Sequence, residues 1–157
     1  MQINNVSSTN FKALRIDPKA AEYLRKCDIK TLEKVEKAGK ELANTKFVDV
    51  LIGQYLGCNI ISARKAFVNP NRNFIMGDFA ISRENFLGQP FDRLSVKDKN
   101  DKLLRGIEDI DKLAEIALSI DNKAIEDLKA LNASKNIVAN SKSVDDAVMK
   151  LLDVYGA

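Results

Sequence analysis

The chain has 157 residues and a formal net charge of +3, with 45% hydrophobic and 30% charged residues. This composition is ordinary for a globular protein, and the length suffices for one domain with a sizeable core. It contains no histidine, no tryptophan and only two cysteines. The lack of histidine excludes the commonest general base, the commonest metal ligand and every nucleophile pair that needs an imidazole.

The apolar segments of the chain are too short to cross a membrane. The two longest, residues 48–52 and 58–63, fall far below the roughly 18 residues that span a bilayer. The first residues lack the basic patch and apolar core of a secretory signal, so we expect a cytoplasmic protein with no membrane partner. In that compartment Cys27 and Cys58 are expected to be reduced and buried.

The first third of the chain predicts a short strand followed by helical structure. Residues 1–10 are polar and are expected to form a flexible segment. Residues 11–16 alternate between apolar and polar side chains, which indicates a strand. Asp17 and Asp28 each place a capping carboxylate before a helical apolar stripe. We therefore expect either two helices at an angle or one long kinked helix, ending near Asn44.

The middle third changes to the patterning of strands. Residues 46–53 are β-branched and almost wholly apolar, as in a central strand covered on both faces. Two further apolar runs, 58–68 and 74–81, flank a turn signal rich in asparagine and proline, which predicts that they form a β-hairpin. We expect residues 46–82 to form a three-stranded antiparallel meander and residues 82–94 to form a connector.

The last third returns to helical spacing. Ser95 and Asp98 resemble a capping box, and the apolar residues that follow predict a long helix over 96–119. A shorter helix is expected over residues 125–131, and Ser143 predicts the start of a last one. The apolar face of that last helix, which we expect to be buried, comprises Val144, Val148, Leu151, Leu152 and Tyr155.

Together these elements predict an α+β fold. A small antiparallel sheet, made of the three-stranded meander and an N-terminal strand, would pack against amphipathic helices and lead into a helical C-terminal part. No low-complexity linker divides the chain, so residues 11–157 are expected to form a single domain. The alternative is a sub-boundary near residue 95, between the sheet and the C-terminal helices.

The hairpin expected in the middle third carries the first candidate binding site. No acidic residue lies between Asp49 and Asp78, whereas this stretch holds three cations, with Phe67 and Phe74 beside them. Cations that hold phosphates beside rings that stack on bases form a surface for single-stranded nucleic acid. Alternatively, the rings point inward as a cross-strand pair and the cations only keep the strands soluble. The residues concerned are Arg64, Lys65, Phe67, Arg72 and Phe74.

An acidic set, Asp49, Asp78 and Glu84, is the alternative site. Carboxylates on a sheet face can ligate Mg²⁺ or act as bases. These three converge only if their strands are neighbours, and Asp49 can instead face solvent or pair with a cation on the next strand. No residue pattern identifies a catalytic group, a metal site or a cofactor.

The helix expected over 96–119 is a third candidate. Its apolar seam can pair with a partner helix or pack on the protein's own sheet. Its acidic residues would then form an outer face on which a basic partner could dock. These residues are Glu108, Asp109, Asp111 and Glu115.

The missing catalytic residues favour a small non-catalytic interaction or regulatory protein that binds another protein without a cofactor. The first alternative is a weak single-stranded nucleic-acid binder through the basic hairpin. Because three cations neutralise few phosphates, such binding would depend steeply on salt. The second alternative is a histidine-free enzyme that uses the carboxylates with Mg²⁺. The sequence leaves the partner and the oligomeric state open.

Overall fold

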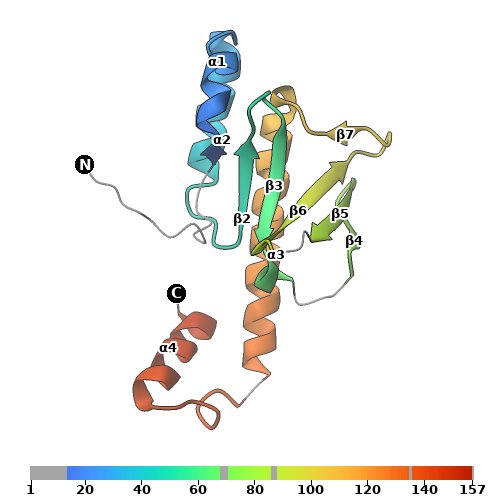
Figure 1. Cartoon of the computed structure of the whole chain (residues 1–157). Coiled ribbons are helices and arrows are strands. Elements are labelled where there is room, and N and C mark those ends of the chain that lie inside the picture. The colour runs from blue at the N-terminus through green and yellow to red at the C-terminus, as the bar shows by residue number, and fades with distance from the viewer. Residues whose placement is uncertain (1–13, 68–70, 86–87, 135, 157) are drawn as a thin grey trace, which may run out of the picture.

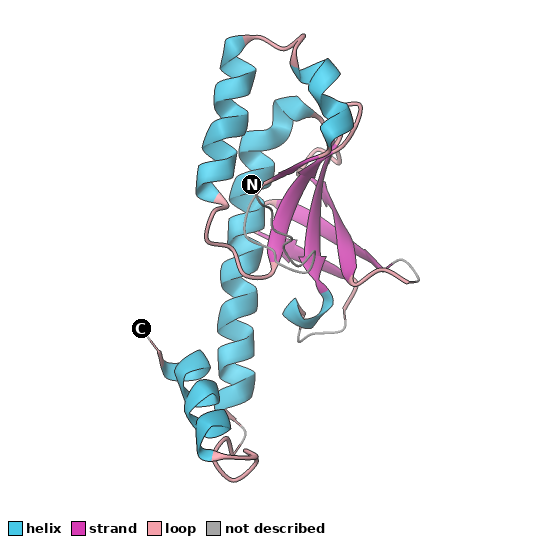
Figure 2. Cartoon of the chain, turned by 60° about the vertical axis from the view of Figure 1, so that its left-hand side comes forward, coloured by secondary structure: helices cyan, strands magenta, loops and turns pink. Residues whose placement is uncertain are grey.

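The structure, a computed structural model, describes residues 14–67, 71–85, 88–134 and 136–156. Within these ranges it has four α-helices and a seven-stranded mixed sheet, so the α+β class is confirmed. The long helix α3 (Ile110–Ala133) crosses one face of the sheet and extends well beyond it (Figures 1 and 2). Among the described helices none combines the length and the apolar character needed to cross a bilayer.

The N-terminal part forms as the capping residues predict. The short strand β1 (Arg15–Ile16) leads into the turn η1 (Pro18–Ala20) and the helices α1 (Ala21–Leu24) and α2 (Ile29–Glu41). The Asp17 carboxylate accepts the Lys19 N–H at 2.9 Å, and the Asp28 carboxylate accepts the Thr31 N–H at 2.8 Å. The pair of helices, rather than one kinked helix, is therefore confirmed, whereas residues 1–10 lie outside the described ranges.

The sheet has the strand order β1-β2-β3-β6-β5-β4, and β7 pairs with β6 beside this path. β1 lies parallel to β2, and all other pairs are antiparallel. The strands after β1 are β2 (Val48–Ile52), β3 (Cys58–Ala63), β4 (Asn73–Met76), β5 (Phe79–Asn85), β6 (Phe91–Lys97) and β7 (Leu103–Leu104).

The predicted three-stranded meander is wrong beyond its first hairpin, and the sheet is larger and mixed. β2 and β3 pair as expected, but the turn η2 (Arg64–Ala66) then leads the chain out of the sheet. The other neighbour of β3 is β6, which comes from the segment predicted as a connector. β4 and β5 form a hairpin of their own around Gly77, whose φ of 62° suits a tight turn. The connector prediction overlooked two strands that alternate between inward and outward side chains.

The predicted helix over 96–119 is also corrected. β6 continues to Lys97, and β7 and the turn η3 (Ile107–Asp109) follow before α3 begins. α3 then runs unbroken for 24 residues and includes the shorter helix predicted over 125–131. The apparent helix start at Ser95 lies inside a strand whose inward residues, Leu94 and Val96, are buried.

The core lies between the inner face of the sheet and the helices α2 and α3. Its apolar side chains come from β2, β3, β5 and β6 on one side and from the first half of α3 on the other. Asp121 of α3 is buried and ties the helix to the sheet: its carboxylate accepts the backbone N–H of Lys46 at 3.0 Å and that of Phe47 at 2.7 Å. These two hydrogen bonds hold the residues just before β2 against the middle of α3.

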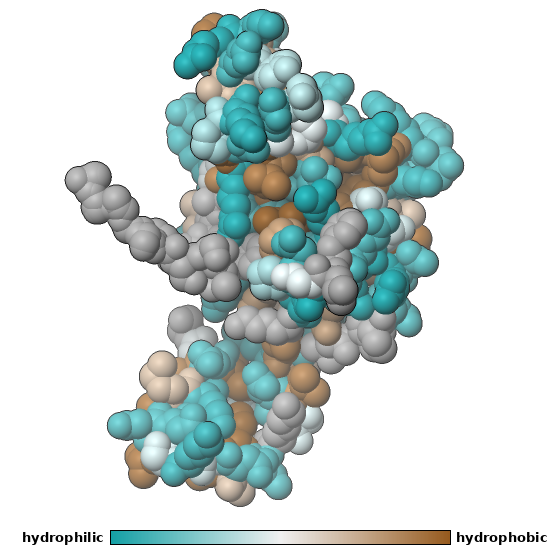
Figure 3. All heavy atoms as spheres, in the orientation of Figure 1, coloured by the Kyte–Doolittle hydropathy of each residue, from teal (hydrophilic) through white to brown (hydrophobic). Residues whose placement is uncertain are grey.

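The last helix, α4 (Val144–Tyr155), begins as predicted but is not buried as predicted. The Asp146 N–H donates to Ser143 Oγ at 3.1 Å, which is the expected cap. Only Ala147 and Val154 of this helix are buried. Its large apolar side chains are exposed: Val144 by 79%, Val148 by 46%, Met149 by 61%, Leu152 by 58% and Tyr155 by 68%. The reason is that α4 packs on the part of α3 beyond the sheet, where hydrophobic residues reach the surface (Figures 1 and 3).

Candidate functional site

A cavity of about 240 Å³ lies between the sheet edge at β4, the turn η2 and α3. Most of its lining is apolar, and Asn71, Lys123 and Asp127 supply the polar groups. Phe67 and Phe74, two of the residues singled out in the sequence, form part of its wall. The apolar lining residues are Ala66, Phe67, Phe74, Ile75, Met76, Ile120 and Ala124.

β4 is an edge strand whose only neighbour in the described sheet is β5 (Figure 1). The Arg83 N–H donates to the Arg72 carbonyl at 2.7 Å, which sets the phase of the hydrogen bonds between the two strands. Because these bonds alternate along an antiparallel pair, the main-chain groups of Asn73 and Ile75 point away from β5. Such outward N–H and C=O groups are the template on which another strand can pair.

The cavity runs along this open edge. Three consecutive residues of β4, Phe74–Met76, line it, although side chains alternate between the two faces of a strand. Phe74 and Met76 are half-buried against the core, whereas Ile75 is 72% exposed. A space that touches all three is therefore a groove between the strand edge and the helix rather than a hole beneath one face.

The two phenylalanines pack against each other and against the core. Their ring centroids are 6.0 Å apart with the planes tilted by 54°. The guanidinium carbon of Arg83 lies 4.5 Å from the centroid of the Phe67 ring. The structure therefore places these rings as an inward pair, with one ring partly covered by an arginine.

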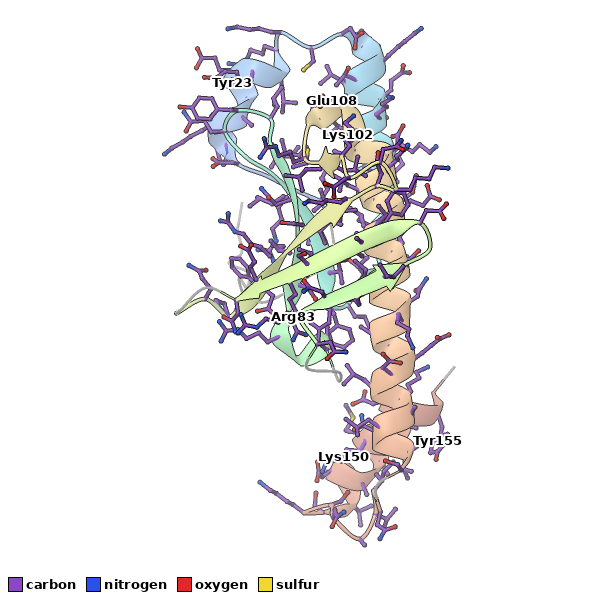
Figure 4. All side chains as sticks on the ribbon, turned by 90° about the vertical axis from the view of Figure 1, so that its right-hand side faces the viewer. Tyr23, Arg83, Lys102, Glu108, Lys150 and Tyr155 are labelled. Atoms are coloured by element: carbon purple, nitrogen blue, oxygen red, sulfur yellow. The ribbon has the colours of Figure 1, made fainter. Side chains whose placement is uncertain are left out.

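A buried carboxylate ties η2, which forms part of the groove wall, to the sheet. Asp92, on β6, is buried and faces Ser62 of β3 and Asn85 of β5 in the strand register. Its Oδ1 lies 3.4 Å from Arg64 Nε and its Oδ2 lies 3.5 Å from Arg83 Nε. Arg64 also donates to the Asn85 side chain. Asp92 thus joins η2 to β5, and Arg83, which is labelled in Figure 4, extends this cluster to the Phe67 ring.

The other predicted cations lie close by along the chain. Lys65 belongs to η2, and Arg72, which directly precedes β4, is exposed. On the opposite wall Lys123 donates to Asp127 at 2.8 Å, and this bond raises the pKa of the lysine. The groove is therefore apolar along its length, with the Lys123–Asp127 ion pair on the wall formed by α3 and the exposed Arg72 just before β4.

The acidic set does not converge. In the sheet register Asp49 of β2 and Glu84 of β5 lie in one row, but β3 and β6 separate their strands by about 14 Å. Asp78 lies in the turn between β4 and β5 and is exposed. No group of three or more acidic or cysteine side chains within the described ranges is arranged to hold a metal ion.

The buried carboxylate of Asp49 instead pairs with the half-exposed side chain of Arg15. Its Oδ2 accepts from Arg15 Nε at 2.8 Å, and its Oδ1 accepts the Val50 N–H at 2.8 Å. Burial raises the pKa of this carboxyl to about 6, although both hydrogen-bond donors act in the opposite direction. The pair ties β1 to β2 and thus links the short edge strand to the sheet.

Two of the four acidic residues of the predicted third site lie beside lysines. Glu108 and Asp109 lie in η3, and Asp111 and Glu115 lie on α3. Asp109 lies 3.9 Å from Lys102, and Asp111 lies 3.8 Å from Lys34. Figure 4 shows Lys102 and Glu108 at the opposite end of the sheet from Arg83. This surface is therefore distinct from the groove at β4.

Sequence reasoning missed the partners that complete the groove. Arg83 and Asp92 were assigned to a connector, and the lining residues of α3 lie beyond the predicted end of its helix. The signal that could have placed Arg83 and Asp92 on strands is a period of two residues. Ile81, Arg83 and Asn85 fall on one side of the segment before Gly88, and inward residues recur at every second position after it. No comparable signal identifies which turn of α3 meets β4, because that depends on how the sheet curves around the helix.

Comparison with known proteins adds no further assignment. No family model matches this chain, and neither a curated protein nor a solved structure is significantly similar to it.

Proposed function

We propose that this chain is a non-catalytic binding module that takes up an extended segment of a partner protein along β4. The observation that supports the proposal is the juxtaposition of an open strand edge and an apolar cavity along it. Strand addition needs both features, because the edge supplies main-chain hydrogen bonds and a pocket supplies selectivity for side chains. The module would hold its partner between a strand and a helix.

The segment would pair with the outward groups of Asn73 and Ile75. Since side chains alternate along a strand, one large apolar residue of the segment would enter the cavity between Phe74 and Ala124. The exposed cation Arg72 just before β4 favours a partner that carries an acidic residue beside this apolar anchor, whereas Lys123 is already paired with Asp127. The expected ligand is thus an extended, apolar and acidic stretch of protein.

The nucleic-acid alternative has less support from this geometry. Stacking on a base requires an accessible aromatic face, whereas Phe67 lies between Phe74 and the Arg83 guanidinium. Arg64, a second element of that site, is engaged with Asp92 and Asn85. The carboxylate enzyme has less support still, because its three acidic residues lie apart.

The test is a selection of binding peptides. A phage-displayed library of random peptides of about ten residues is screened against the purified chain, since a segment of this length spans an edge strand. The enriched peptides should carry an apolar residue flanked by an acidic one. Ile75→Pro removes an outward N–H, and Ala124→Leu narrows the cavity. Each should weaken binding of the enriched peptides about tenfold or more.

Val148→Asp, on the exposed face of α4, is the matched control and should bind the same peptides unchanged. Wild-type affinity in both groove variants would contradict the proposal, as would a library that yields no binder. Titration with fluorescent single-stranded RNA at about 50 and 200 mM salt tests the alternative: binding that collapses with salt would favour a nucleic-acid partner.

A further inference from the structure

The exposed face of α4 defines a second surface, independent of the groove at β4. At 100° per residue, Val144, Val148, Leu152 and Tyr155 fall within an arc of about 80° on this helix. We call these four residues the α4 stripe. α4 packs on α3 through the neighbouring flank, where the small residue Ala147 and Val154 are buried. α4 thus buries the side with fewer and smaller apolar residues against α3, and the four large apolar residues of the stripe stay exposed.

We propose that the α4 stripe is a self-association surface, on which α4 of a second copy of this chain docks in the antiparallel direction. Soluble monomers rarely expose a contiguous patch of large apolar residues without a partner for it. α3 and α4 form a two-helix arm beyond the sheet, as Figure 2 shows, and two such arms would complete a four-helix bundle. A two-fold axis would bury the same patch on both copies.

Charge on α4 favours a second copy over a basic or acidic partner. Asp146, Lys150 and Asp153 lie more than about 130° around the helix from the centre of the stripe. Lys150 and Asp146 also pair with each other at 3.1 Å, on the side away from the stripe. Asp145 is the one charged residue of α4 beside the stripe, about 60° from its centre. In an antiparallel pair the two copies of Asp145 lie near opposite ends of the seam, so no like charges meet, and a strongly charged partner would find only this carboxylate to pair with.

The remaining polar groups at the stripe are self-complementary. When Val148 of one copy faces Leu152 of the other, an antiparallel register brings Asp145 opposite Tyr155 of the second copy. A carboxylate accepts from a phenol hydroxyl, and the two-fold axis makes this contact twice. Both side chains are exposed in the single chain, and Tyr155 projects from the end of the helix (Figure 4).

The test is the mass of the chain in solution. Sedimentation velocity over roughly 5–200 µM should show conversion from 17.5 kDa to twice that mass. The double variant V148D/L152D should remain monomeric throughout, and Tyr155→Phe should weaken the dimer by at least several-fold. Helix packing on α3 uses other residues, so both variants should keep the wild-type circular dichroism spectrum.

The control is Ile75→Asp, which places a charge on an equally exposed apolar residue of β4 and should leave the dimer intact. A wild-type chain that stays monomeric up to the highest concentration overturns the proposal. A dimer that persists in V148D/L152D also overturns it, because another surface must then hold the copies together. Neither result bears on peptide binding at the groove, which is measured separately.

Discussion

The helices α3 and α4 have similar amphipathic patterns but differ in what covers them. In the first half of α3 the inward residues Leu113, Ile116 and Ile120 are buried against the sheet. On α4 the residues at equivalent spacing form the exposed stripe. The periodicity of a sequence therefore predicts which face of a helix is apolar. Whether that face is buried within the same chain depends on how far the sheet extends along the helix.

Truncating one leucine on each helix gives the sharpest contrast. Leu113→Ala should cost about 2–5 kcal/mol of unfolding free energy, because it leaves a cavity between α3 and the sheet. Leu152→Ala should cost less than about 0.5 kcal/mol in dilute, monomeric protein. Urea denaturation at low concentration measures both. Equal losses would mean that the two helices are covered alike within one chain.

The bond between α3 and the start of β2 provides the second test. Asp121→Ala should cost about 3 kcal/mol, because it leaves the N–H groups of Lys46 and Phe47 without their acceptor. The control is Asp127→Ala, in the part of α3 that extends toward the arm. The partly exposed carboxylate of Asp127 accepts a hydrogen bond from the side chain of Lys123. The loss for this variant should lie within about 0.5 kcal/mol. A cost for Asp127→Ala as large as that for Asp121→Ala would contradict the division of α3 into an anchored half and an exposed half.

The ion pair on the sheet predicts a pH dependence. The pKa of Asp49 is raised to about 6 in the folded chain, above its ordinary value of 3.8. The folded state therefore binds this proton more tightly, and stability falls as the pH rises through this range. Between pH 5 and pH 7 the wild type should lose roughly 1 kcal/mol relative to Asp49→Asn. Parallel stability curves for the two proteins would show that the carboxyl titrates normally.

Capping of α4 tests whether the arm opens independently of the sheet. Ser143→Ala removes the side chain that accepts the Asp146 N–H and should cost α4 about 1 kcal/mol. Amide hydrogen exchange in α4 should then accelerate about fivefold, while the first half of α3 keeps wild-type rates. Ser119→Ala, an exposed position in the middle of α3, is the control and should change neither. Equal acceleration in both helices would mean that the molecule unfolds as one unit.

Local signals in the sequence predicted the elements whose causes are local. The caps at Asp17, Asp28 and Ser143 and the hairpin of β2 and β3 are confirmed, because each depends on residues a few positions apart. The insertion of β6 between β3 and β5 was missed, because strand order depends on contacts between distant segments. The single helix α3 was predicted as two helices, and the first was placed too early, because residues of β6 and β7 were assigned to it.

The candidate site was predicted in part. The sequence singled out Phe67 and Phe74, which the structure brings together, and it named the inward pair as one of two interpretations. It did not identify Asp92, which ties η2 to the sheet, its partner Arg83 on β5, or the residues of α3 on the other wall of the groove. The exposure of the α4 stripe was also unpredictable, since the pattern of a buried face and that of an interface are the same.

Hydrogen exchange at β4 tests the central claim of strand addition most directly. The backbone N–H groups of Asn73 and Ile75 point away from β5 and should exchange rapidly in the chain alone. Saturation with a peptide enriched from the library should slow the exchange of these two amides at least tenfold, because both would donate to the added strand. Unchanged exchange at Asn73 and Ile75 in the saturated complex would contradict the account.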